Sequence, residues 1–348
     1  AVAVLFLPDY PALERWPDTR ESRRTRAPLT VDGIRSTTGG PVLPTATLSA
    51  RAVGVLFAGQ TIRAQEIFQR AVRREPAAPF ALTPTTTVRL DIVATEEHLA
   101  TSNVVAVLDG SDPVRKHEYV ALGAHYDHLG LGHDRNSLEA NSAGKIHNGA
   151  DDNASGVSGV LELARYFAKN DVKEQHNFLF LCFSGEELGL MGSKKFTETP
   201  GIDLAKVNFM INMDMIGRLN DEKRIMVGGV GTAPEFVPLI NSIKSGLTVK
   251  QDSAGIGPSD HTSFYLKNIP VLFFFTGQHS DYHKPSDDIE KVNFNGVKEV
   301  LDYAAGMIES LDKKPKLAFQ QTKSRQEDTP RFKVTLGIMP DYTYEGEG

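Results

Sequence analysis

The sequence predicts an α/β protein with a three-layer main domain, in which helices cover both faces of a mostly parallel central sheet, and a small β-rich module before it. In the main part of the chain, apolar runs of strand length alternate with segments whose apolar residues recur three and four positions apart. The runs at 178–183 and 271–275 are apolar throughout, as expected of strands that are buried on both faces.

Seven runs of strand length and three amphipathic segments support this prediction. The runs lie at 88–95, 103–110, 119–127, 177–185, 207–214, 224–229 and 269–277. The amphipathic segments lie at 154–170, 233–246 and 295–311, and the spacing of their apolar residues predicts helices with one buried side. Because strands and helices alternate, we expect the helices to lie on both faces of one sheet.

Composition divides the chain into three parts. Residues 1–84 use Arg and no Lys as the basic residue, and short apolar stretches at 1–7 and 52–59 predict the β-rich module. The chain opens on what reads as a strand, so we expect a fragment or a mature form. Residues 85–314 form the predicted main domain. Residues 315–348 start as a charged segment without periodicity, which predicts a linker, and end in a strand-like stretch that we interpret as the opening of a further domain.

Charge and composition exclude several classes of protein. Against 44 Asp and Glu there are 38 Lys and Arg, and the formal net charge of −6 argues against a nucleic-acid-binding protein of the usual basic kind. No apolar run approaches the roughly 20 residues that a membrane-spanning helix needs. The single cysteine, Cys182, can form no internal disulfide, and its apolar surroundings predict an inert buried thiol.

Polar side chains follow the apolar runs directly, where ligands bind in an open parallel sheet. They are His125, Asp127, Asp151, Asp152, Glu186, Glu187, Asp214, Asp260, His261 and His283. So many carboxylates at one edge would repel one another and would be costly to desolvate without a cation among them. An oxygen-rich set with imidazoles and no thiolate favours zinc, or a neighbouring divalent transition metal, in a catalytic site.

Each of these signals is ambiguous when taken alone. Adjacent acids at a helix start commonly complement the helix dipole, and a single histidine at a strand end can be a core residue. Agreement among five strand ends favours the metal interpretation. Three further histidines, His128, His133 and His147, lie in a Gly-, Asn- and Ser-rich segment, and we expect solvated loop residues there.

Six motifs carry a resemblance to a known family. They are HYDH at 125–128, NGADDNASG at 148–156, SGEELGLMGS at 184–193, NMDMIG at 212–217, PSDHTSF at 258–264 and DYHKPSDD at 281–288. Over about 119–312 the sequence resembles the co-catalytic zinc aminopeptidases of peptidase family M28. Residues 1–84 resemble the second half of a protease-associated (PA) domain, and the last dozen residues resemble the start of a PDZ-like domain.

The resemblance implies a site with two zinc ions. It implies that Asp152 bridges the ions, that His125 and Asp214 complete one metal site, and that Glu187 and His283 complete the other.

It also implies roles for residues that do not bind metal. Asp127 would accept a hydrogen bond from the second ring nitrogen of His125, and Glu186 would be the general base. Asp260 and His261 would lie close to the site without ligating. Some relatives have a Tyr that donates to the oxyanion near the position of Ile256, so we expect Tyr282 to substitute for it.

The implied function is a zinc-dependent exopeptidase that removes N-terminal residues from peptides. A carboxypeptidase or a glutaminyl-cyclase-like enzyme on the same fold is an alternative, and a carboxypeptidase would need a basic residue such as Arg218 for the substrate carboxylate. A non-catalytic binding protein is a further alternative, although all five ligands and the base are present. Relatives with PA and PDZ-like modules are commonly exported, so we expect a periplasmic or secreted protein. Side-chain specificity and oligomeric state have no readable signal.

Overall fold

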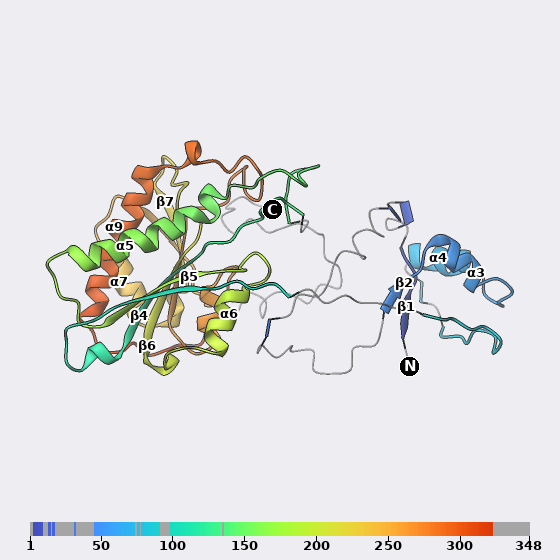
Figure 1. Ribbon diagram of the computed structural model, residues 1–348, viewed down its shortest axis with the longest axis horizontal. Helices are drawn as coiled ribbons and strands as arrows, with labels where there is room; N and C mark the ends of the chain where they lie inside the picture. The colour runs from blue at the N-terminus through green and yellow to red at the C-terminus, as the bar shows by residue number, and fades with distance from the viewer. Residues whose placement is uncertain are drawn as a thin grey trace. The chain divides into compact units, whose positions relative to one another are not determined.

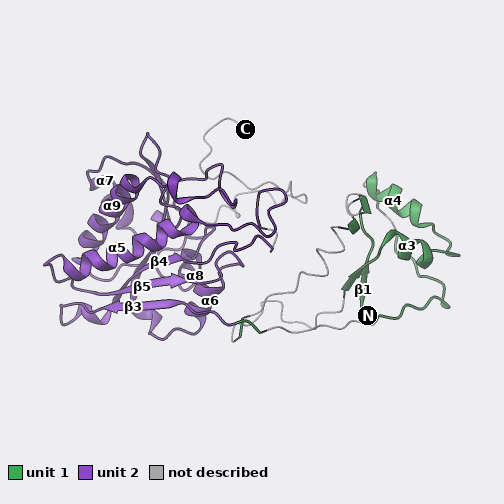
Figure 2. Ribbon diagram, turned by 45° about the horizontal axis from the view of Figure 1, so that its top comes forward, with its two compact units in different colours: residues 1–99 green, residues 100–348 purple. Residues whose placement is uncertain are grey.

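The structure is a computed structural model of the 348-residue chain. It describes residues 3–9, 13–14, 16–17, 31–32, 45–73, 75–76, 78–90, 98–133 and 136–322. The chain divides into two compact units, residues 1–99 and 100–348 (Figure 2). The boundary therefore lies at Leu99, further along than the change in composition near residue 84. Within the described ranges, no helix is long and apolar enough to cross a membrane.

The second unit is built on a seven-stranded sheet with the strand order β3-β5-β4-β6-β9-β7-β8 (Figure 1). The strands are β3 (Val104–Leu108), β4 (Tyr119–His125), β5 (Asn177–Phe183), β6 (Val207–Met213), β7 (Arg224–Gly228), β8 (Thr248–Gln251) and β9 (Val271–Phe275). The four central strands, β5, β4, β6 and β9, are mutually parallel. Strand β3 is antiparallel to β5, and β7 is antiparallel to β9. The predicted mostly parallel sheet is confirmed.

Helices cover both faces of this sheet. They are α5 (Gly156–Lys169), α6 (Met191–Glu198), α7 (Phe236–Ser242), α8 (His261–Tyr265) and α9 (Phe294–Asp312), with short turns η1 (Arg115–His117), η2 (Ala150–Ser155), η3 (Leu204–Lys206), η4 (Val230–Thr232) and η5 (Ile289–Lys291). One apolar cluster joins α5, α7 and α9 to the sheet, and a second cluster joins α6 and α8 to it. The predicted three-layer architecture is confirmed.

The side-chain periods of strand and helix account for the two clusters. Successive strand residues point to opposite faces, so Val120 and Leu122 of β4 join the first cluster while Ala121 joins the second. In α5 the buried residues Val160, Leu163 and Phe167 recur three and four positions apart, which places them on one side of the helix. Helix α5 therefore crosses the sheet with its apolar side inward.

The described part of the first unit contains helices as well as strands. Strands β1 (Val4–Phe6) and β2 (Thr45–Thr47) form a parallel pair, followed by α3 (Ala50–Leu56) and α4 (Ala64–Val72). The apolar stretch at 52–59 thus lies mostly in a helix, although it was expected in a β-rich module. Ser49 explains the difference, because its side chain accepts a hydrogen bond from the backbone N–H of Ala52 and caps the helix.

Two expected segments lie partly or wholly outside the described residues. Of the expected strand at 88–95, residues 88–90 form no strand and the others are not described. The PDZ-like segment at the end of the chain is not described either. The PA-like identity of the N-terminal module stays a prediction.

Residues 315–322 differ from the linker that their composition predicts. Leu317 is buried in the first apolar cluster, and Phe319 packs on the ring of Tyr265 with 5.4 Å between ring centroids. The backbone N–H of Thr322 donates to the Tyr265 hydroxyl at 2.9 Å. Apolar contacts and hydrogen bonds together hold this segment on the domain.

A buried polar network lies at the amino ends of the central strands. Asp312 accepts hydrogen bonds from the backbone N–H groups of Gln175 and His176, at 2.7 and 2.9 Å, and from His176 Nδ1 at 2.8 Å. His176 Nε2 accepts from the Asn208 amide, whose oxygen in turn accepts from the N–H of Leu317. The network therefore ties the end of α9 and the segment after it to the starts of β5 and β6.

Replacing the Asp312 carboxylate tests the network through the pH dependence of the free energy of unfolding. Burial alone would raise the pKa of Asp312, but the hydrogen bonds from His176 and from the Gln175 backbone hold it below its usual value. A depressed pKa contributes stability that is complete above the unfolded-state pKa, about 4, and disappears as the pH falls through the folded-state value. Asp312→Asn should lower the free energy of unfolding by about 1–3 kcal/mol at pH 7.

The measurement is urea unfolding of both proteins between pH 3 and pH 7. The difference between them should shrink below about pH 4 and disappear as the pH falls through the depressed pKa of the folded wild-type carboxylate. A difference that stays constant over this range would contradict the proposed charge-assisted hydrogen bonds.

Candidate metal centre

The structure brings the five expected metal ligands together at the carboxyl edge of the sheet. They are His125 at the end of β4, Asp152 in η2, Glu187 in the loop after β5, Asp214 directly after β6 and His283 in the loop after β9. Because β5, β4, β6 and β9 are parallel, the residues that follow these strands meet at the same edge. The arrangement expected from the strand ends is therefore present.

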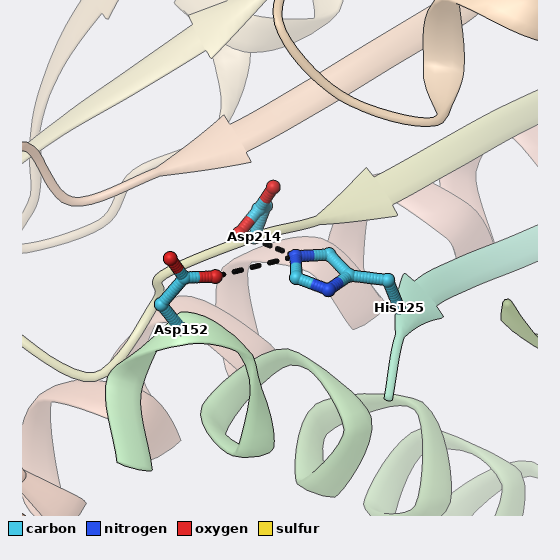
Figure 3. Close-up of side chains that lie close together, drawn as sticks. All are labelled: His125, Asp152 and Asp214. Carbon is cyan, nitrogen blue, oxygen red and sulfur yellow. Dashed lines mark ion pairs between the residues drawn. The ribbon is translucent and has the colours of Figure 1, made fainter. Parts of the chain in front are cut away.

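These side chains form two groups that share one carboxylate. His125 Nε2 lies 3.3 Å from Asp152 Oδ1 and 3.4 Å from Asp214 Oδ1, and Figure 3 shows both carboxylates turned toward the imidazole. His283 Nε2 lies 3.4 Å from Asp152 Oδ2 and 3.1 Å from Glu187 Oε2. Asp152 thus presents one oxygen to each group, as a bridging ligand would.

Backbone carbonyls set the orientation of both imidazoles. A carbonyl oxygen can only accept, so His125 Nδ1 donates to the Asp127 carbonyl at 3.0 Å, and His283 Nδ1 donates to the Asn136 carbonyl at 2.9 Å. In each neutral ring the Nε2 lone pair then faces carboxylate oxygens with no proton between them. This is the tautomer that a metal-binding histidine needs.

The carboxylates around His125 and His283 favour positive charge at this edge of the sheet. Burial alone would lower the pKa values of His125 and His283, but the neighbouring carboxylates outweigh it and raise that of His283 to about 10 and that of His125 well above its usual value. Protons on these rings or divalent cations between the groups would satisfy the same need, so metal and protons compete for the site.

The donor set and its spacing fit zinc. Zn²⁺ with bonds of about 2.0–2.2 Å in a tetrahedron separates its ligand atoms by roughly 3.3–3.6 Å. The Nε2-to-oxygen distances of 3.1–3.4 Å are close to that spacing. Asp214 Oδ1 is buried and has no hydrogen-bond partner among the described residues, which a cation would supply.

Asp127 acts differently from what the resemblance implies. Its carboxylate oxygen is 3.8 Å from His125 Nδ1, and the hydrogen bond from that nitrogen goes to its backbone carbonyl instead. The carboxylate accepts from the backbone N–H groups of Glu186 at 3.0 Å and of Glu187 at 3.3 Å. Asp127 therefore holds the loop that carries the two adjacent glutamates.

Glu186 lies beside the two groups without joining either. Its Oε2 is 4.0 Å from His125 Nε2, and the residue lines the cavity described below. Burial, reinforced by the negative charges of Asp214 and Asp260, raises the pKa of Glu186 well above its usual value. A carboxylate in this setting has a strengthened affinity for a proton.

The expectation for His128 was wrong. Its side chain is 8% exposed, and its Nδ1 lies 2.7 Å from Glu187 Oε1 and 3.8 Å from Asp152 Oδ2. His147 is also buried, but its ring nitrogens contact the Lys145 carbonyl and the Ser137 hydroxyl within the same loop. His133 is exposed, as expected. The available signal for His128 was its place three residues after His125 in HYDH.

Asp287 is a second residue that the sequence did not single out. Its Oδ2 accepts from the backbone N–H groups of Asp151 and Asp152, at 2.9 and 3.1 Å, and its Oδ1 lies 3.0 Å from Arg218 Nη2. Arg218 also lies 3.3 Å from Asp281 Oδ2. Asp287 thus fixes the backbone that presents Asp152, and Arg218 is engaged by two carboxylates.

Asp151 faces away from the two groups. Its Oδ1 accepts from the Gly217 N–H at 2.6 Å, and its Oδ2 lies 3.1 Å from His279 Nε2. Adjacent Asp151 and Asp152 therefore have different roles: the first anchors the loop after β6, and the second joins the metal centre.

A cavity of about 430 Å³ opens onto the centre. Apolar walls come from Met215, Met226, Ile256, Phe273 and Phe275, and the floor includes the metal-binding side chains. The cavity can receive an apolar side chain next to the candidate metal centre.

Two of the three residues expected near the site line this cavity. Tyr282 and His261 line it, and His261 stacks on Phe273 with 4.5 Å between ring centroids. Burial lowers the pKa of His261 to about 3, so its ring is neutral. Asp260 is fully buried, and burial raises its pKa to about 7. Asp260 and His261 thus lie by the site and outside the two ligand groups.

The fold and the two linked groups define a class: α/β proteins with a candidate two-metal centre at the carboxyl edge of a mostly parallel sheet. The chain belongs to peptidase family M28, whose family model matches residues 103–308.

Several known proteins are similar to parts of this chain. A probable leucine aminopeptidase of Arthroderma otae is 26% identical over 228 residues, 62% of this chain and 58% of the relative. Aminopeptidase YwaD of Bacillus subtilis is 29% identical over 196 residues, 52% of this chain and 42% of the relative. Among solved structures, an aminopeptidase from Aneurinibacillus sp. strain AM-1 has a TM-score of 0.48 and 26% identity, covering 63% of this chain and 48% of its own. The chain thus spans less than two thirds of each of these relatives.

The position of Asp287 gives a test that is independent of activity. Asp287→Ala should weaken zinc binding about 10–100-fold. The backbone that carries Asp152 loses two hydrogen bonds, and Arg218 loses an ion-pair partner. Zinc affinity of the metal-free protein, measured by competition with a chelator, checks this. Asp288→Ala is the matched control. Asp288 is the next residue, and its carboxylate accepts from the exposed Asn148 amide. Equal affinities in both variants would show that Asp287 does not support the centre.

Proposed function

We propose that the chain is a zinc-dependent aminopeptidase that binds two metal ions and removes apolar N-terminal residues from peptides. The observation that carries the proposal is the pair of His–carboxylate groups that share Asp152 and open onto an apolar cavity. Family membership supports it, and so do the aminopeptidase names of the relatives.

The metal-binding residues in this proposal are the five that converge. His125 and Asp214 would hold one zinc ion, Glu187 and His283 the other, and Asp152 both. Two such ions would polarise the scissile carbonyl, lower the pKa of a water molecule and stabilise negative charge on the oxyanion.

The proton transfers fall to Glu186. It lies next to the first group, lines the cavity and is not needed as a ligand, so it can take a proton from the attacking water and deliver it to the leaving amine. Asp127 keeps this side chain in place through its hydrogen bond to the Glu186 backbone. Tyr282 lines the same cavity, and burial among carboxylates raises the pKa of its phenol, which keeps the hydroxyl protonated for donation to the oxyanion.

The charge at the edge of the cavity favours a free amino terminus. Carboxylates of Glu186, Glu187 and Asp214 line the cavity beside its apolar walls, so a substrate can place its ammonium group among acids and its first side chain against Met226 and Phe273. The carboxypeptidase alternative loses support, because Arg218 already pairs with Asp281 and Asp287.

Two further parts of the proposal rest on resemblance alone. We propose that the N-terminal unit is a partial PA-like module and that the protein works outside the cytoplasm.

The substrate class is tested with leucine p-nitroanilide, free and N-acetylated, on metal-free and zinc-loaded protein. The zinc-loaded protein should cleave the free amine and leave the blocked substrate intact, because acylation removes the charge that the carboxylates bind. Removal of zinc should abolish the reaction and its return should restore it. Equal cleavage of the blocked and free substrates would contradict the assignment as an aminopeptidase.

Variants of the adjacent residues Glu186 and Glu187 test which glutamate is the base and which is the metal ligand. Glu186→Gln should lower kcat about 10²–10⁴-fold while zinc content stays near that of the wild type, because a proton acceptor is lost and no ligand is. Glu187→Gln should lower zinc content itself, since a ligand carboxylate loses its charge. Both are measured on the same preparations, by initial rates and by elemental analysis. A fall in zinc content of similar size in both variants would remove the distinction between base and ligand.

A further inference from the structure

We infer that His128 is a positioning residue of the second metal site, which directs one chosen oxygen of Glu187 toward the metal. This inference rests on the proposed function and extends it to a residue outside the ligand set implied by the family resemblance. The second site is the group of Asp152, Glu187 and His283.

The proton on His128 can be assigned from its contacts. A glutamate that binds zinc is deprotonated, so the role of Glu187 as a ligand makes both of its oxygens acceptors. An ionised carboxylate only accepts, and His128 Nδ1 lies 2.7 Å from its Oε1. Nδ1 therefore donates to Glu187. His128, Asp152 and Glu187 also form a group that could hold a metal ion, but Nδ1 cannot bind a metal while it donates this hydrogen bond.

The other ring nitrogen agrees with this assignment. His128 Nε2 is buried and has no hydrogen-bond partner among the described residues, so a proton there would be left unsatisfied. The contacts of both ring nitrogens therefore agree with a hydrogen bond donated from Nδ1 to Glu187.

The hydrogen bond divides the two oxygens of Glu187 between different partners. Oε1 is engaged by His128, while Oε2 lies 3.1 Å from His283 Nε2. With one oxygen engaged, Glu187 offers a single ligand atom to the second site instead of chelating with both. The first site is further from this contact, because His125 and Asp214 make no hydrogen bond to His128 in the described structure and the shared Asp152 presents its other oxygen, Oδ1, to His125.

The local backbone is shaped to hold the His128 ring. Gly149 has φ 61°, and a Cβ there would clash first with the Asp152 carbonyl oxygen and then with His128 Cγ at 2.7 Å, so glycine leaves room for both the backbone turn and the imidazole. The ring also lies edge-on to that of His283, with 5.7 Å between centroids. The imidazole is thus confined between the loop that presents Asp152 and the second histidine.

The test is calorimetric titration of the metal-free protein with zinc, on the wild type and three variants. His128→Phe keeps the volume of the ring and removes the donor, His128→Asn keeps an N–H donor, and His133→Ala is a control at an exposed histidine of the same loop. The wild type should bind two ions. In His128→Phe one of the two affinities should fall about 10–100-fold while the other stays within about twofold. His128→Asn should recover part of the loss, and His133→Ala should match the wild type.

The outcomes separate this inference from the proposed function. A wild type that binds two ions, together with unchanged or equally weakened affinities in His128→Phe, would refute the role of His128 alone. A wild type that binds no ion or one ion would refute both. If His128→Phe does not fold, as judged by its thermal transition, His128→Ala takes its place. One of its two affinities should fall about 10–100-fold, and two affinities equal to those of the wild type would refute the inference.

Discussion

Mutual repulsion among carboxylates at the end of the sheet is the constraint on which the rest of the site depends. Asp152, Glu187 and Asp214 lie within a few ångströms of two imidazole nitrogens whose lone pairs face them. Such a group is stable when cations occupy it, and it raises the pKa values of its histidines when they do not. The fold supplies the framework that keeps these charges together.

The surrounding structure shows how that framework works. Backbone carbonyls of Asp127 and Asn136 orient the two histidines, and the carboxylates of Asp127 and Asp287 hold the backbone beside the ligands. Most of these contacts join segments that follow different strands. The metal centre is therefore supported by the loops at one edge of the sheet, and the two apolar clusters below keep the strands that carry those loops in register.

Much of the fold and the candidate ligands could be predicted from the sequence for a simple reason. Apolar runs such as 178–183 have the length of strands, and a polar residue directly after such a run must lie at the end of the sheet. His125 and Asp214 follow this rule without any knowledge of distant contacts. The short apolar stretch at 52–59 was ambiguous, because its length suits a strand or a helix, and the cap at Ser49 decides it.

The contacts that escaped prediction depend on how loops fold back. His128 is buried only because its loop returns to Glu187, which lies 59 positions further along the chain. Arg218 pairs with Asp287 across 69 positions, which no local pattern reveals. Whether Asp127 uses its carboxylate or its carbonyl toward His125 is a matter of less than one ångström, since the two distances are 3.8 and 3.0 Å. Side-chain geometry at that scale is not encoded in residue spacing.

The most direct test of the central claim is anomalous diffraction at the zinc absorption edge from crystals grown with zinc. Two peaks are predicted, both beside Asp152, one reaching His125 and Asp214 and the other reaching Glu187 and His283. Crystals with full zinc exposure and no anomalous peak among these residues would contradict the account, as would a single peak in the same place.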